Sequence, residues 1–209
     1  MTHRQRRRTD RHRGGFSIIE LLIAVAILGV MAAIAVPALA PAARGYRLLG
    51  DARTVVHTVS LAKMRAAAAF TRVRLRADTG AGTYHIERWD TTVTPNNWVA
   101  EGGVERLSPG VALGIGGLTS SPPNTQGAGT IFHRACFDNG TPAVAIANTA
   151  CVVFNSRGVP IDSTGAPLGG NGLYVTDGIT VFGTMVAATG LANLYSTPHV
   201  TPAAWQKVQ

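Results

Sequence analysis

Residues 16–43 form an apolar run of 28 residues that contains a single ionisable side chain, Glu20. About 20 apolar residues in a helix cross the hydrocarbon core of a bilayer, so the run is long enough to span a membrane. A core helix of this length without a polar face would be unusual in a domain this small. The fifteen residues before the run contain six arginines and one aspartate, which predicts that this end stays in the cytoplasm.

A cleavable secretory signal is the main alternative for this run, because it also has a basic start and an apolar stretch. Ala38, Leu39 and Ala40 resemble a small-residue cleavage site. The run is longer than a usual signal-peptide core of about 7–15 residues, and such a core has no need for an acidic residue. A twin-arginine signal is a weaker alternative, because the hydrophobic residues expected directly after the arginines are missing.

The carboxylate of Glu20 requires an explanation, because ionisable groups inside a membrane cost several kcal/mol unless they are paired. The same span contains no basic residue. Cleavage between Gly15 and Phe16 would create an α-amine that is cationic at neutral pH. Glu20 lies four residues after Phe16, about one helical turn, so it could pair with its own terminus or with that of a neighbouring helix.

A basic leader that ends in glycine, followed by Phe-Ser-Ile-Ile-Glu and an apolar stretch, resembles the signal of type IV pilins and type II secretion pseudopilins. The resemblance implies that prepilin peptidase cuts after Gly15 and that the new terminal Phe16 is N-methylated. It also implies that Glu20, the fifth residue of the mature chain, recruits the subunit into a filament. Pro37 falls where this family often kinks its helix.

The apolar run continues into an amphipathic segment, residues 44–70, so we expect one long helix from about Phe16 to about Phe70. Apolar residues recur there at intervals of three and four, while basic residues fill the other positions. The apolar positions are Leu48, Leu49, Ala52, Val55, Val56, Val59, Ala62, Met64 and Ala66. Residues 1–15 are then a cleaved cytoplasmic leader, residues 16–43 the transmembrane half of the helix and residues 44–70 its periplasmic half.

Residues 71–209 have the alternation and turn composition of a β-rich globular head. Residues 71–77 alternate apolar side chains with Arg72, Arg74 and Arg76, which predicts a strand with one wet, basic face. A turn at residues 78–82 and a second strand at residues 83–89 would complete a hairpin. We expect a flexible loop at residues 118–129 and a loose tail at residues 196–209. Further short strands are predicted at residues 110–115, 130–133, 151–155, 171–176 and 178–187.

The expected fold is therefore α+β and pilin-like. A long N-terminal helix, half transmembrane and half amphipathic, would pack on a C-terminal head of antiparallel β-sheet or sandwich. The pattern of residues 152–162, followed by residues 172–178, resembles the C-terminal part of the GspH/FimT subgroup of minor pseudopilins. In that subgroup a strand ends in a phenylalanine, and a glycine turn leads into the last hairpin.

The two cysteines, Cys136 and Cys151, both lie in the part of the chain expected outside the cytoplasm. Extracytoplasmic cysteines commonly pair, so a disulfide between them is the preferred interpretation. The alternative is a pair of buried free thiols. The chain contains no Cys-x-x-Cys motif, and two cysteines are too few for a zinc site.

The sequence offers no motif for catalysis, a metal or a cofactor. The six histidines are spread along the chain, and no Gly-x-Ser-x-Gly or phosphate-binding loop occurs. Asp78-Thr-Gly could suggest an aspartic protease, but that chemistry needs a second carboxylate that shares the proton. Thr176-Asp177-Gly178 lacks the same residue order, and both sites are typical of turns. We expect a non-enzymatic protein without a cofactor or a small-molecule substrate.

The leading functional hypothesis is a minor pseudopilin of the type II secretion pseudopilus, anchored in the inner membrane with its head in the periplasm. Its expected partners are prepilin peptidase, other pseudopilins or pilins, the inner-membrane assembly platform and the lipid bilayer.

The alternative is a FimT-type minor pilin of a type IV pilus, involved in pilus assembly or in DNA binding and uptake. Eight basic residues against two aspartates between residues 44 and 78 support DNA binding, which would be strongly salt-dependent. The net charge of +8 is weak support for DNA binding, because most of it belongs to the leader. Only 13 basic and 10 acidic residues follow the leader. A solvated helix face, or one near anionic headgroups, explains the same residues.

Overall fold

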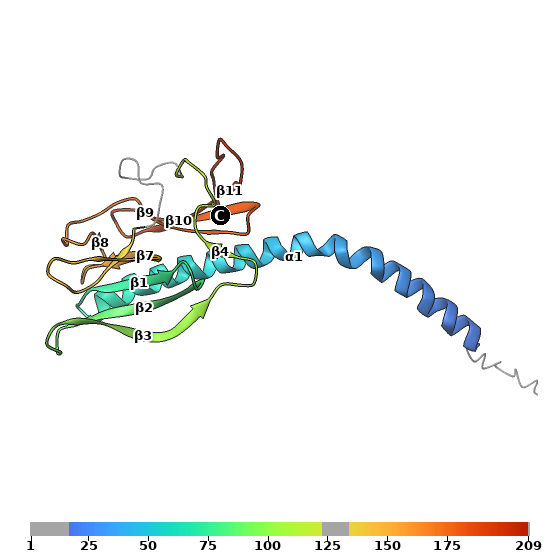
Figure 1. Ribbon diagram of the computed structural model, residues 1–209, viewed down its shortest axis with the longest axis horizontal. Helices are drawn as coiled ribbons and strands as arrows, with labels where there is room; N and C mark the ends of the chain where they lie inside the picture. The colour runs from blue at the N-terminus through green and yellow to red at the C-terminus, as the bar shows by residue number, and fades with distance from the viewer. Residues whose placement is uncertain (1–16, 123–133, 209) are drawn as a thin grey trace, which may run out of the picture. The chain divides into compact units, whose positions relative to one another are not determined.

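The computed structural model describes residues 17–122 and 134–208 (Figure 1). By its internal contacts the chain divides into two compact units, Met1–Pro41 and Ala42–Gln209. A single long helix, α1 (Ile18–Ala68), contributes to both units and matches the predicted helix to within two residues at each end.

Among its described residues, the second unit adds twelve strands to the C-terminal part of α1, and all the pairs that these strands form are antiparallel. The pilin-like α+β fold predicted from the sequence is therefore confirmed. The strands are β1 (Val73–Asp78), β2 (Thr83–Asp90), β3 (Asn97–Arg106), β4 (Ala112–Leu113), β5 (Cys136–Phe137), β6 (Ala145–Ile146), β7 (Thr149–Phe154), β8 (Pro160–Ile161), β9 (Asn171–Thr176), β10 (Thr180–Val186), β11 (Ala192–Pro198) and β12 (Gln206–Lys207).

Ten of these strands form two five-stranded sheets, and β5 and β6 form a small ribbon. The first sheet has the order β3-β2-β1-β7-β8, so β7 returns from far along the chain to pair with β1. The second sheet has the order β12-β11-β10-β9-β4. Both sheets lie beside the C-terminal part of α1 (Figure 1).

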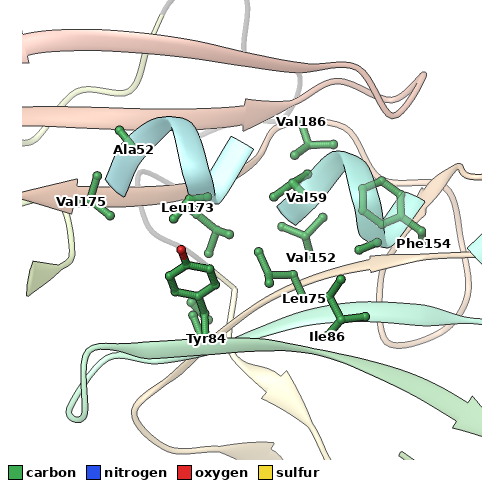
Figure 2. Packing of buried hydrophobic residues seen from close by; sticks show 14 of the residues in the cluster. Ala52, Val59, Leu75, Tyr84, Ile86, Val152, Phe154, Leu173, Val175 and Val186 are labelled. Atoms are coloured by element: carbon green, nitrogen blue, oxygen red, sulfur yellow. The ribbon is translucent and has the colours of Figure 1, made fainter. Parts of the chain in front are cut away.

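The core of this unit is built around one stripe of α1 and the inner faces of both sheets. Six buried residues of the helix recur at alternating intervals of four and three, which places them on one face. They contact inward-facing residues such as Leu75 and Val152 of the first sheet and Leu173 of the second (Figure 2). The six helix residues are Leu48, Ala52, Val55, Val59, Ala62 and Ala66.

The predicted apolar stripe of the helix needs one correction. Met64 interrupts the alternating intervals and lies 61% exposed. The stripe therefore runs through Ala62 and Ala66, whose small side chains allow the helix to approach the sheets closely.

The prediction of a wet, basic face on residues 71–77 was wrong for its central arginine. Arg74 is only 3% exposed, because other parts of the chain cover the outer face of the first sheet. Its Nε donates to Glu87 of β2, and its Nη1 donates to the carbonyl of Phe137 at 2.7 Å. The guanidinium also lies 4.2 Å from the centre of the Trp98 ring.

The prediction of a loose tail was also wrong for residues 196–208. Residues 196–198 complete β11, and β12 pairs with β11 through Tyr195 and Ser196. Between them Trp205 packs on Tyr174 and donates its indole N–H to the carbonyl of Ser120 at 3.0 Å. The predicted strand at residues 130–133 and part of the predicted loop lie outside the described residues.

The structure joins Cys136 and Cys151 in a disulfide, as the preferred interpretation of the sequence predicted. Cys151 belongs to β7, whereas Cys136 begins β5 in the segment that we call the disulfide arm, residues 134–146. The amide of Cys151 also donates to the carbonyl of Arg134 at 2.7 Å. The arm is thereby attached to the first sheet by a covalent bond and by hydrogen bonds.

Candidate functional site: the N-terminal helix and its first turn

The first turn of α1 is organised by Ser17, which precedes the first helical residue. Its hydroxyl accepts a hydrogen bond from the amide of Ile19 at 3.3 Å, and its carbonyl accepts from Leu21 at 3.1 Å. Serine is favoured at this capping position because it satisfies a backbone N–H that has no partner within the helix. The Ser-x-x-Glu spacing of a helix start was present in the sequence but was not used in the prediction.

Glu20 lies in this first turn and is exposed. Within the part of the chain that the structure describes, its carboxylate has no hydrogen-bond or ion-pair partner. A negative charge near a helix N-terminus interacts favourably with the helix dipole, but this contribution is only about 0.3–1 kcal/mol. The dipole therefore offsets a small part of the cost of placing the carboxylate in an apolar environment, and the need for a cationic partner remains.

The apolar side chains that follow Glu20 have no cover within the chain. The stretch Ile18–Val36 is long and apolar enough to cross a membrane by length and composition, and none of it is buried within the structure. Twelve large hydrophobic residues of this stretch are each at least half exposed. Their surface is compatible with a membrane anchor, which the apolar run also predicted.

The other predicted residues of the N-terminal site have different outcomes. Gly15 and Phe16, the predicted cleavage and methylation positions, lie outside the described residues. The helix assignment of α1 extends through Pro37, and the kink expected there stays a prediction. The structure therefore brings Ser17 and Glu20 together in one turn and leaves the processing chemistry to be tested.

Half of the basic residues between positions 44 and 76 are engaged by the head itself. Arg65 pairs with Glu101 at 3.0 Å, and Lys63 donates to the carbonyl of Thr189 at 3.1 Å. Arg74 and Arg76 both contact Glu87. The four others are exposed and form no ion pair within the described residues; they are Arg44, Arg47, Arg53 and Arg72.

The two Asp-Gly elements that were weighed as protease motifs belong to separate turns. One carboxylate oxygen of Asp78 accepts hydrogen bonds from the amides of Gly80 and Ala81. Asp177, in the turn between β9 and β10, accepts in the same way from Ile179 and Thr180. Both carboxylates therefore stabilise turns in different sheets, as expected from the sequence. Among residues 17–122 and 134–208, no three histidine, cysteine or acidic side chains form a metal-binding group.

Comparison with known proteins gives one positive finding. Residues 10–36 match the model of the prokaryotic N-terminal methylation motif. No curated protein and no solved structure matches the chain. The motif covers Gly15, Phe16 and Glu20, and it implies processing by prepilin peptidase and assembly with other pilins.

An inner-membrane anchor with a periplasmic head is compatible with the motif and with the apolar helix that it overlaps. The head also has the expected architecture, because the amphipathic part of α1 packs on antiparallel sheets. Together, the methylation motif and the fold support a type IV pilin-like or pseudopilin-like protein.

Proposed function

We propose that this chain is a non-enzymatic minor pseudopilin of a type II secretion pseudopilus, of the GspH/FimT type. The observation that carries the proposal is the combination of a methylation motif with a helix whose first part is wholly unburied and contains one carboxylate. Lipid covers this apolar surface before assembly, and neighbouring helices cover it in the filament. The β-rich head then faces outward.

The role of Glu20 follows from the same combination. In a filament core built from apolar helices, an unpaired carboxylate is costly, so a subunit docks in the register that brings Glu20 to a cationic terminus. The processed Phe16 of the neighbouring subunit supplies such a terminus. Prepilin peptidase and the assembly platform would supply the enzymatic steps, with this chain as substrate and cargo.

The assignment to the GspH/FimT type rests on the region after β7. That strand ends at Phe154, and the side chain of Asn155 accepts from the amides of Arg157 and Val159 to form a tight turn. Gly158 occupies this turn with φ of 71°, a conformation that favours glycine. The β9–β10 hairpin follows, which agrees with the subgroup pattern and supports a minor subunit.

A type IV pilus minor pilin that binds DNA is the second candidate. It is favoured by the four exposed arginines between residues 44 and 72. It is disfavoured by the internal hydrogen bonds and ion pairs of the other four basic residues, which reduce the charge available for phosphate contacts.

Deletion of the gene separates the two candidates. In the pseudopilin case, the deletion strain loses secretion of folded proteins into the medium, and the full-length chain restores it. Twitching and DNA uptake stay unchanged. Loss of DNA uptake or of pilus assembly with normal protein secretion would contradict the proposal and favour the second candidate.

A further inference from the structure

The outer face of the first sheet carries a cavity that the assembly role of the helix does not use. It has a volume of about 140 Å³ and lies between the sheet and the disulfide arm. Trp89 and Trp98 form part of its wall, with ring centres 5.1 Å apart in an edge-to-face arrangement. We call this cavity the outer-sheet pocket.

The walls of the outer-sheet pocket are held in place by the protein. The disulfide arm is attached by the Cys136–Cys151 bond and by the hydrogen bond from Arg74 to the Phe137 carbonyl. Asn139 of the arm donates to the carbonyl of Asn96 at 3.0 Å, close to the start of β3. Arg74 at the same time contacts the Trp98 ring. A pre-formed pocket of this kind lowers the entropic cost of binding a ligand.

The mouth of the pocket carries hydrogen-bonding groups of both kinds that the protein leaves free. Arg72 and Arg134 are exposed, and neither side chain has a hydrogen-bond or ion-pair partner within the described residues. Asp138 and Asp162 also line the pocket, and each uses one carboxylate oxygen to cap its own turn. The second oxygen of each carboxylate has no hydrogen-bond or ion-pair partner in the described part of the chain.

Asn171 of β9 also lines the pocket. Asn171 is only 3% exposed, and its amide oxygen has no hydrogen-bond partner among the described residues. Because this oxygen is itself fully buried, it is not a contact for an occupant of the pocket, and a ligand faces the charged residues and the tryptophan wall instead.

These groups together restrict the chemistry of the occupant. A simple anion would face Asp138 and Asp162, a cation would face the two arginines, and an apolar side chain would leave all of them desolvated without partners. Hydroxyl groups both donate and accept hydrogen bonds, so a ring with several hydroxyls can satisfy both signs of charge. A cavity near 150 Å³ holds one six-membered ring.

We propose that the outer-sheet pocket binds a single sugar ring of a glycan, with the ring against the tryptophan wall and its hydroxyls toward Arg72, Arg134 and Asp162. The C–H face of a sugar is apolar and suits an aromatic wall. The glycan could be part of the cell envelope or part of a secreted glycoconjugate, and both present the same ring chemistry. None of the described residues that line the pocket belongs to α1.

The test uses the full chain in a detergent that carries no sugar headgroup, with ligand-observed NMR as the readout. Neutral hexoses, N-acetylhexosamines and hexuronates are titrated separately, followed by peptidoglycan fragments and lipopolysaccharide core oligosaccharides. We expect saturation transfer to at least one neutral saccharide, and the last two ligands distinguish the envelope sources. No transfer to any saccharide at tens of millimolar would overturn the proposal.

Two substitutions decide between a sugar and an anion. Arg134→Gln and Asp162→Asn should each weaken saccharide binding about tenfold, since each removes a charge-assisted hydrogen bond. Asparagine keeps the turn-capping oxygen of residue 162, and exposed Arg157, which does not line the pocket, provides the control Arg157→Gln with unchanged binding. If Asp162→Asn strengthens binding, or if polyglutamate binds and the saccharides do not, the pocket is an anion site and the proposal is wrong.

Discussion

Arg74 and Glu87 lie directly opposite each other in the register of β1 and β2 and form an ion pair that is almost completely buried. Arg76 and His85 contact the second oxygen of the same carboxylate, at 3.2 and 3.0 Å. The pair connects β1 and β2 to the disulfide arm through the Phe137 carbonyl. It therefore fixes the outer face of the first sheet.

Truncation of one partner should destabilise the head strongly. Arg74→Met leaves the Glu87 carboxylate buried without its main partner, which typically costs about 3–5 kcal/mol in the free energy of unfolding. Chemical denaturation of the full chain, followed by circular dichroism, measures this loss.

The double variant Arg74→Met with Glu87→Met provides the control for this prediction. It should recover most of the lost stability, because replacing a buried pair by apolar residues of similar volume is often neutral or stabilising. A single variant that loses less than about 1 kcal/mol would contradict the importance of the pair, since that is the range of exposed ion pairs.

The same pair predicts that the head loses stability in acid. Burial by itself would raise the pKa of the Glu87 carboxyl, but the charge of Arg74 and hydrogen bonds from Arg74 and His85 outweigh it and hold the pKa below its usual value. The native state thus binds this proton more weakly than the unfolded chain. The stabilisation is complete above the unfolded pKa of about 4.3 and is lost as the pH falls through the lower, folded value.

Denaturation curves between pH 7 and pH 3 test this dependence. The free energy of unfolding should fall with decreasing pH, and the fall should be shallower in the double variant that lacks both Arg74 and Glu87. Equal slopes in the two proteins would show that other carboxyls account for the acid sensitivity.

Two turns, one from each sheet, meet beside Lys63 of α1. A Cβ atom at Gly190 would collide with the backbone carbonyl of Gly158, and both glycines have positive φ. Gly178 in the β9–β10 turn also has positive φ, of 86°, but a Cβ there would meet no atom within 4 Å. Alanine at either position would adopt an unfavourable positive φ, but only at residue 190 would its Cβ atom also collide with another part of the chain.

We therefore expect Gly190→Ala to destabilise the protein by about 1–3 kcal/mol more than Gly178→Ala, the usual range for overpacking. Thermal and chemical unfolding of the two variants provide the comparison. Equal losses would mean that the turns at residues 158 and 190 do not pack as closely as the structure places them.

Prediction from the sequence succeeded where the signal was local. The apolar run, the position of Glu20 and the three-four spacing from Leu48 to Ala66 are read along one helix, and α1 begins and ends within two residues of its predicted limits. The Cys136–Cys151 pairing could be predicted because the chain has only two cysteines and both were expected outside the cytoplasm.

The sequence predictions failed where contacts between residues far apart in the chain determine the structure. Arg74 alternates with apolar residues like a solvent-facing side chain, but the disulfide arm and Trp98 of β3, both far along the chain, contact it. β3 itself was not predicted, because Gly102, Gly103 and its charged residues have low strand propensity. The outer-sheet pocket depends on the same non-local cover, so no pattern in the sequence indicated it.

Filament assembly should depend on the carboxylate of Glu20. Glu20→Ala should leave cleavage after Gly15 intact, because the carboxylate is not needed for the cut, but should lower incorporation into the filament at least about tenfold. Loss of one partner from a buried ion pair costs about 3–5 kcal/mol, and each 1.4 kcal/mol is a factor of ten. Shear fractionation with immunoblotting measures incorporation.

Leu22→Ala is the matched control for Glu20→Ala, because Leu22 is an exposed apolar residue of the same helix and carries no charge. It should assemble at nearly the normal level. Normal incorporation of Glu20→Ala would refute the assembly role of the carboxylate.

The most direct test of the whole account is the mass of the mature N-terminal peptide, measured on the chain purified from membranes of its native host. The account predicts a chain that starts at Phe16 and carries one added methyl group on its α-amine. This terminus would supply the cationic partner that Glu20 lacks within the described residues. A mature chain that starts after Ala40 would contradict the account, because ordinary secretion would then have removed the helix on which assembly depends.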